Sequence, residues 1–187
     1  MDAIWRLDEE LSVALRLDPP NRDYLFIIEW LFHGVPWIGG SFLWAAAAIG
    51  GKWPNDTQDK IILLNIGLFL DLLISGALKI FVQRPRPLHN REDFRYGAPI
   101  ADQFSFPSGH TTRVAMLARL LETLVSMDPI LNKLMWLFVG CVAVSRVSMG
   151  RHHPTDVIAG VLIGILEAYM TLAMPLGLRR GLIRIFI

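Results

Sequence analysis

Long apolar segments are the feature that most constrains what this chain can fold into. A helix that crosses the roughly 30 Å hydrocarbon core of a bilayer needs about 20 mostly apolar residues. Four segments meet or approach this requirement: residues 61–82, 111–126, 131–148 and 157–176. A fifth, 24–49, is long enough but is interrupted around Pro36, so it is expected to form one kinked span or two shorter helices. The sequence therefore predicts an all-α integral membrane bundle of five to six transmembrane helices.

Composition agrees with a membrane protein and excludes some classes. Of 187 residues, 53% are hydrophobic and only 19% are charged, which is unusually apolar for a soluble domain of this size. The formal net charge of +1 does not favour a nucleic-acid partner. The chain has one cysteine, Cys141, so a disulfide within it is excluded. Since no repeat or long linker divides the chain, we expect a single domain over residues 1–187.

The first twenty residues have a different pattern. Ile4, Leu7 and Leu11 recur at helical spacing, with acidic residues elsewhere around the turn. This pattern predicts an interfacial helix within residues 1–20 that ends at Pro19. The basic region and cleavage site of a secretory signal are not evident, so we expect the first span to remain in the mature protein.

Polar residues concentrate where the expected helices end. If five spans alternate in direction, the loop 83–106 and the stretch 146–154 fall on one membrane face. Three clusters lie there: Lys79, Arg86 and Pro87; Pro107, Ser108, Gly109 and His110; Ser145, Arg146, His152 and Asp156. Packing of antiparallel helices is expected to bring these clusters together, with loop 83–106 on the side of the active site.

The clusters contain the groups that bind a phosphate. Arg86 and Arg146 have planar guanidinium groups that can bind phosphate oxygens bidentately, and Lys79 adds a point charge. Ser108 and Gly109 precede an apolar helix, whose first N–H groups lack partners within the helix and bind anions readily. Clusters with metal-ligand spacing are not evident on this face, so a metal is not implied.

Two histidines complete a catalytic set. Asp156 lies four residues after His152, so the carboxylate is expected to accept from one ring nitrogen and leave the other free to attack phosphorus. His110 is the candidate general acid for the leaving group. Singly, these residues have simpler explanations: Lys79 and Arg86 could only anchor a helix end at the headgroups. The joint pattern favours a site.

The three clusters resemble the signature motifs of the type 2 phosphatidic acid phosphatase superfamily, K-x6-R-P, P-S-G-H and S-R-x5-H-x3-D, in that order. The resemblance implies that His152 forms a phosphohistidine, that Asp156 supports it and that His110 protonates the leaving group. It also implies hydrolysis without magnesium or another cofactor. The phosphate-binding residues that it implies are Lys79, Arg86, Ser108, Gly109 and Arg146.

Within that superfamily, four segments are similar to the eukaryotic polyisoprenoid diphosphate phosphatase branch, which includes the presqualene diphosphate phosphatase. They are residues 33–37, 70–90, 105–113 and 145–157. This likeness implies a membrane-bound substrate of the presqualene or farnesyl diphosphate type and a location in the endoplasmic reticulum or nuclear envelope. Basic residues outside the spans are more numerous on the face of the motifs, which favours a cytoplasmic active site.

Three alternatives remain open. A phosphatidate, lysophospholipid or sphingoid phosphate phosphatase would use the same residues. A vanadate-dependent haloperoxidase has a similar pocket, but such enzymes are typically soluble and larger. A non-enzymatic membrane partner protein of the superfamily usually lacks the nucleophile or the acid, whereas His110, His152 and Asp156 are all present here.

Other polar residues are expected to be structural. Charges inside a span cost about 2.5 to 3.5 kcal/mol on insertion scales. Pairing is therefore expected for Glu29, His33, Asp71 and Glu167, although Asp71 could also support Lys79. Contact with lipid headgroups is expected for Arg84, Arg91 and Arg95. Gly160 and Gly164 form a small-xxx-small step that favours helix packing.

Overall fold

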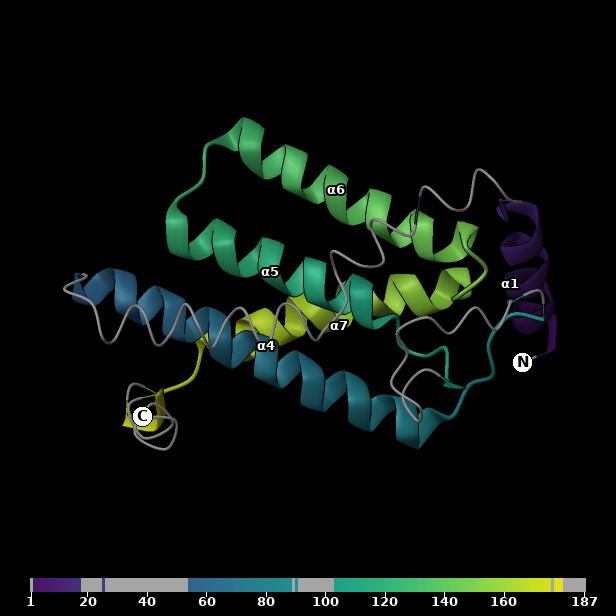
Figure 1. Ribbon diagram of the computed structural model, residues 1–187, viewed down its shortest axis with the longest axis horizontal. Helices are drawn as coiled ribbons and strands as arrows, with labels where there is room; N and C mark the ends of the chain where they lie inside the picture. Colours follow the sequence, from purple (N-terminus) through teal and green to yellow (C-terminus); the bar gives the residue numbers. More distant parts are fainter. Residues whose placement is uncertain are drawn as a thin grey trace.

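The computed structural model describes residues 2–17, 25, 54–88, 90, 103–175 and 177–179. Its helices are α1 (Asp2–Ala14), α4 (Asn55–Val82), α5 (Gly109–Val125), α6 (Pro129–Ser148) and α7 (Pro154–Leu172). Helices α4 to α7 run side by side, and α1 lies across one end of this bundle (Figure 1). The expected span 24–49, apart from Leu25, lies outside the described residues, as do Arg91 and Arg95.

Three of the described helices are long and apolar enough to cross a membrane: Asp56–Val82, Pro129–Ser148 and Pro154–Leu172. Large apolar side chains of α6 and α7 are exposed on the outside of the bundle, among them Leu134, Leu137, Ile158, Leu162 and Leu166. An exposed apolar surface of this kind is suited to lipid rather than water. The prediction of a helical membrane bundle is confirmed.

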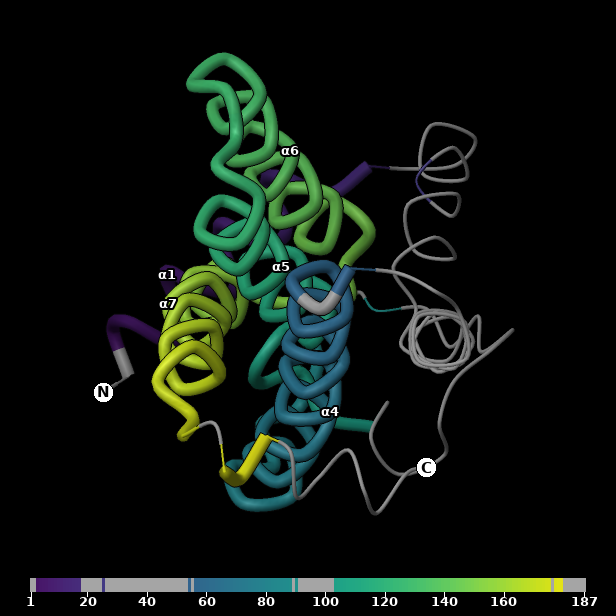
Figure 2. The backbone as a smooth tube through the Cα atoms, turned by 90° about the vertical axis from the view of Figure 1, so that its left-hand side faces the viewer, coloured from purple at the N-terminus to yellow at the C-terminus, as the bar shows by residue number. Residues whose placement is uncertain are grey.

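Helix α5 differs from the prediction of a fourth apolar span. Its 17 residues agree well with the expected 111–126, yet the helix is too short and too polar for a lipid-exposed span. Viewed nearly along the helices, α5 lies among α4, α6 and α7 (Figure 2), and it contacts all three. Its buried residues include Thr111, Thr112 and Arg113. These polar groups are tolerated because they face other helices.

Small residues bring α7 against α5. A Cβ atom added to Gly164 would lie 2.2 Å from the Thr112 carbonyl oxygen and 2.9 Å from the Met116 nitrogen. At Gly160 it would lie 3.2 Å from the Ser108 carbonyl oxygen. The two helices therefore approach backbone to backbone next to the P-S-G-H cluster, as the small-xxx-small step predicts.

The helix ends near the clusters have specific terminators. Helix α4 begins at Asn55, earlier than the predicted residue 61, because the polar first turns also become helical and are stabilised by an ion pair of 2.7 Å between Lys60 and Asp56. It ends at Val82, and the C-cap residue Gln83 is left-handed (φ 50°) and donates its N–H to the Lys79 carbonyl oxygen. This end leaves Lys79 in the last helical turn, from which its Nζ donates to the Phe104 carbonyl oxygen near the end of loop 83–106.

Candidate active site

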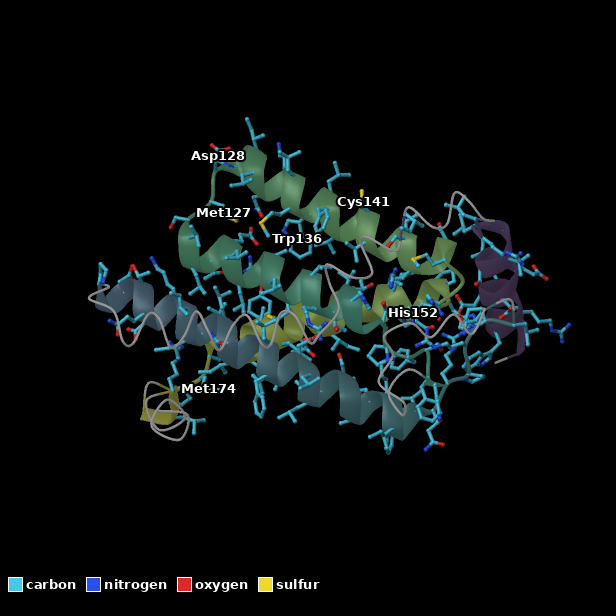
Figure 3. The ribbon with its side chains drawn as sticks, viewed as in Figure 1. Met127, Asp128, Trp136, Cys141, His152 and Met174 are labelled. Carbon is cyan, nitrogen blue, oxygen red and sulfur yellow. The ribbon has the colours of Figure 1, made fainter. Side chains whose placement is uncertain are left out.

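The three clusters meet at one end of the bundle. The Ser108 N–H donates to the Asp156 carbonyl oxygen at 3.2 Å. Arg86 Nη1 donates to the Arg151 carbonyl oxygen at 3.1 Å. Figure 3 shows His152 at this end, close to α1, and Asp128 at the opposite end. Residues about seventy apart in the sequence thus surround one site, in the arrangement that the antiparallel spans predict.

His152 lies in the connection between α6 and α7 and is only 4% exposed. Its Nδ1 is 2.7 Å from the Ser105 carbonyl oxygen. Because a carbonyl oxygen can only accept, Nδ1 must carry the hydrogen, and Nε2 then holds the lone pair. This tautomer is the one in which Nε2 can act as a nucleophile.

Asp156 does not accept directly from His152, which corrects the sequence prediction. Its Oδ2 lies 4.0 Å from His152 Nδ1 and accepts instead from the His153 N–H at 2.9 Å. Its Oδ1 accepts from Arg84 Nη1 at 2.5 Å. The reason is local: Asp156 is the third residue of α7 and closes a capping box with His153, which fixes the carboxylate on the helix end. The Asp156 carboxylate therefore lies near the imidazole without a hydrogen bond to it.

Three cations surround the imidazole. Lys79 and Arg146 are buried, and Lys79 Nζ donates to the Phe104 carbonyl oxygen at 3.0 Å. Burial holds the pKa of His152 well below its ordinary value of 6.5, and the positive charges of Arg86, Lys79 and Arg146 lower it further. The imidazole is therefore neutral at physiological pH, and the same cations are placed to bind a phosphate.

The start of α5 has the form of an anion site. Ser108 is the N-cap residue, fully buried, with its hydroxyl oxygen 3.0 Å from that of Thr111. A Cβ atom added to Gly109 would meet no described atom within 4 Å, so the backbone there is open to a ligand. His110 follows in the first turn and is half-buried. This arrangement agrees with the phosphate-binding role expected for Ser108 and Gly109.

Arg84 was predicted to lie among lipid headgroups, and this prediction is wrong. The residue is 6% exposed, and its side chain donates to Asp156 Oδ1, to Thr155 Oγ1 at 2.6 Å and to Asp8 Oδ2 at 2.5 Å. Its guanidinium also lies 4.3 Å from the centre of the Trp5 ring. A sequence signal was available: Arg84, like Arg86, directly precedes a proline, which restricts both residues to extended backbone in one rigid segment.

Sequence reasoning also missed the contribution of α1. Asp8 was placed on the polar side of an interfacial helix, yet it is 3% exposed. Burial raises its pKa, but hydrogen bonds from Thr155 and Arg84 outweigh that effect and hold the pKa of Asp8 below its ordinary value. The neighbouring Glu9 accepts from the Leu88 N–H at 3.1 Å. The spacing of residues within α1 cannot indicate these contacts, because the partners of Asp8 and Glu9 lie more than seventy residues away in the sequence.

A second polar network lies deeper, between α4 and α5. The expected pairing of Asp71 is confirmed, since its carboxylate lies 2.6 Å from Arg113 Nη2 and accepts from Thr112 Oγ1 at 2.7 Å. The Thr112 hydroxyl is also 2.9 Å from the Gly109 carbonyl oxygen, so the network reaches the first turn of α5. For Glu167 the expectation of pairing is wrong: its carboxylate is buried and accepts no hydrogen bond within the described part of the chain.

In the part of the chain that the structure describes, three or more histidine, cysteine, aspartate or glutamate side chains nowhere gather into a group that could hold a metal ion. The groups described above are instead three cations around the His152 imidazole, whose Nδ1 donates to the buried Ser105 carbonyl oxygen.

Comparison with known proteins decides the family. Residues 60–180 match the PAP2 superfamily, a range that contains all three clusters. The chain belongs to the PAP2 superfamily. It is 31% identical over 186 residues to the phosphatidylglycerophosphatase B of Bacillus subtilis (strain 168), covering 90% of this chain and 83% of that protein. Family membership thus confirms the resemblance that the motifs indicated.

Two further comparisons agree with this assignment. The decaprenylphosphoryl-5-phosphoribose phosphatase of Mycolicibacterium smegmatis (strain ATCC 700084 / mc(2)155) is 32% identical over 128 residues, which are 68% of this chain and 64% of that protein. A solved structure from Bacillus subtilis, a transmembrane PAP2 type phosphatidylglycerolphosphate phosphatase, has the same fold, with a TM-score of 0.68, 24% identity and coverage of 92% of this chain and 86% of that one. The chain spans from 47% to 83% of the length of the curated relatives it matches. The prediction of a phosphatase is confirmed at the level of the family, whose matching members are named as phosphatases.

Proposed function

We propose that this protein is a membrane lipid phosphatase that acts through a phosphohistidine at His152. One observation supports this proposal most strongly. The Ser105 carbonyl oxygen holds Nδ1 of a buried neutral imidazole, which leaves the Nε2 lone pair for attack, and three cations lower the pKa of that imidazole. A structural histidine would have no need of Lys79, Arg86 and Arg146 around it, whereas a phosphoryl group needs all three charges.

The reaction has two chemical steps in this scheme. The phosphate binds to the cations and to the first N–H groups of α5, and Nε2 attacks phosphorus while His110 gives a proton to the departing oxygen. The phosphohistidine keeps its proton on Nδ1 and is cationic at the ring, stabilised by the Ser105 carbonyl oxygen and by the Asp156 charge at 4.0 Å. Water then attacks phosphorus, His110 takes a proton from it, and Nε2 leaves with its lone pair restored.

For the substrate we propose a polyisoprenoid diphosphate or monophosphate of the presqualene or farnesyl type. The apolar outer surfaces of α6 and α7 keep a lipid tail beside the bundle while the headgroup reaches its end. The similarity of residues 70–90 and 145–157 to the polyisoprenoid branch supports this choice, as does the relative named for a decaprenylphosphoryl substrate. A glycerolipid phosphate is the second candidate, because the relative named for phosphatidylglycerophosphate covers 90% of this chain.

A substrate panel separates these candidates. Phosphate release by the purified protein in lipid vesicles with EDTA would be compared for farnesyl diphosphate, presqualene diphosphate, phosphatidate, phosphatidylglycerophosphate and sphingosine phosphate. We expect turnover in EDTA, the highest kcat/KM for an isoprenoid diphosphate, and no turnover by His152→Ala. Activity that disappears with EDTA, or that persists in His152→Ala, would remove the proposed mechanism.

We also propose that the site faces the cytoplasm from the endoplasmic reticulum or nuclear envelope, as the excess of basic residues on that face indicates. Leu88 suits a test because it follows the first cluster and its side chain is 92% exposed. In a Cys141→Ala background, Leu88→Cys should react with a membrane-impermeant maleimide when only the plasma membrane of cells is permeabilised. Labelling that requires permeabilised internal membranes would contradict this orientation.

A further inference from the structure

Helix α1 is attached to the active-site end of the bundle through one buried carboxylate. Asp8 Oδ2 accepts from Arg84 Nη2 at 2.5 Å and from the Thr155 hydroxyl at 2.5 Å, and Asp8 Oδ1 accepts from the Thr155 N–H at 3.0 Å. With 3% of the side chain exposed, these contacts replace water almost completely. A carboxylate that is buried in this way loses its hydration, which is costly unless a cation pairs with it. For Asp8 that cation is Arg84.

Arg84 connects this carboxylate to the site. Arg84 Nη2 donates to Asp8, and Arg84 Nη1 donates to Asp156 Oδ1. The other carboxylate oxygen of Asp156, Oδ2, lies 4.0 Å from His152 Nδ1. Asp8, Arg84 and Asp156 together contain two negative charges and one positive charge. The group therefore has a net charge of −1 directly behind the nucleophile, and Asp8 provides the excess.

We propose that Asp8 is a positioning residue for catalysis, which fixes Arg84 and offsets its charge so that Asp156 can stabilise the cationic phosphohistidine. This inference rests on the proposed function. Without the Asp8 charge, the guanidinium would neutralise Asp156, and the imidazole would gain a positive charge among Lys79, Arg86 and Arg146 with little compensation. Asp8 touches none of the phosphate-binding residues in the described contacts, so its effect falls on the chemical step rather than on binding.

The first test compares two carboxylates on the same helix in the full-length protein. Asp8→Asn removes the buried charge, and Glu10→Gln removes one from an exposed residue two positions away. We expect Asp8→Asn to lower kcat about tenfold or more with little change in KM, and Glu10→Gln to change neither. Equal kcat values for the two variants, in a protein whose wild-type form is active, would overturn this inference alone.

A second test separates charge balance from simple attachment of α1. Arg84→Gln leaves two carboxylates without their cation, whereas Asp8→Asn combined with Arg84→Gln restores the net charge of −1 and leaves no buried guanidinium unpaired. We expect the double variant to be more active than Arg84→Gln, and more active than the product of the single effects predicts. A double variant less active than Arg84→Gln would overturn the inference even if Asp8→Asn alone fails to fold.

Failure of the proposed function looks different from failure of this inference. A wild-type protein that releases no phosphate from any lipid of the panel, or an active His152→Ala, removes the proposed function itself. If His152→Ala abolishes phosphate release but Asp8→Asn leaves it unchanged, the proposed function stands and only the positioning role of Asp8 is removed.

Discussion

The contact between α5 and α7 makes a prediction whose size follows from the structure. In Gly164→Ala, the new methyl group would lie 2.2 Å from the Thr112 carbonyl oxygen and 2.9 Å from the Met116 nitrogen. Both neighbours belong to the backbone of α5, so a rotamer change cannot relieve the contact. Reaching an ordinary separation of about 3.5 Å from the oxygen requires the helices to move apart by about 1.3 Å.

This displacement should affect stability and activity together. Overpacking of this kind costs about 1 to 3 kcal/mol. It would also separate Ser108, the N-cap residue of α5, from Asp156 of α7, and these two residues are joined at the site by a hydrogen bond of 3.2 Å. Because misplacement of catalytic groups by about 1 Å can reduce rates about 100-fold, we expect a loss of that order in kcat/KM.

The assay is thermal unfolding in detergent combined with phosphate release by the fraction that remains folded. Gly140→Ala is the matched control: it lies in α6, where an added Cβ meets no described atom within 4 Å. We expect Gly140→Ala to keep wild-type activity and stability. Wild-type values for Gly164→Ala in both measurements would show that α5 and α7 are not in the contact described here.

Four further predictions concern the His152 imidazole, the buried Asp71 and the N-cap of α6. The lowered pKa of His152 places the acid limb of kcat/KM well below pH 6.5, and Arg86→Gln, by removing a positive charge, should move that limb to higher pH in a pH-rate profile. For the same histidine, the unfolded chain binds the proton more readily, so its contribution to stability is complete above pH 6.5 and is lost as the pH falls below it, which thermal unfolding at several pH values can measure. Asp71→Asn should lower the free energy of unfolding by about 3 to 5 kcal/mol, because it leaves the buried Arg113 without its carboxylate; an unchanged unfolding midpoint would contradict this. Asp128→Ala removes the N-cap of α6 at the opposite end of the bundle, so it should cost about 1 kcal/mol in denaturation and leave kcat/KM unchanged.

The parts of the site that depend on local sequence were predictable. Apolar length and helical spacing gave the spans near α4, α6 and α7, because a helix in lipid must satisfy its own backbone and cover it with apolar side chains. Fixed spacing within each cluster placed Lys79, His110 and His152 at helix ends. Alternation of the spans then placed those ends on one face, which the structure reproduces.

The parts that depend on the backbone or on distant contacts were not predictable. The acceptor for His152 is the carbonyl group of Ser105, and a backbone carbonyl has no signature in a sequence. Asp156 had the right spacing to accept from the His152 ring, but its carboxylate accepts instead from the His153 N–H, which caps the first turn of α7. For Arg84, the proline that follows it indicated a rigid segment, but its two carboxylate partners could not be identified because they lie in α1 and α7.

Identification of the phosphorylated atom tests the central claim most directly. The wild-type protein would be mixed with an isoprenoid diphosphate, quenched in alkali within a single turnover, and mapped by mass spectrometry and ³¹P NMR. We predict an acid-labile, base-stable phosphate on Nε2 of His152, absent from His152→Ala. Phosphate on Nδ1 or on another residue, or complete turnover without any phosphorylated protein, would contradict the placement of the nucleophile against the Ser105 carbonyl group.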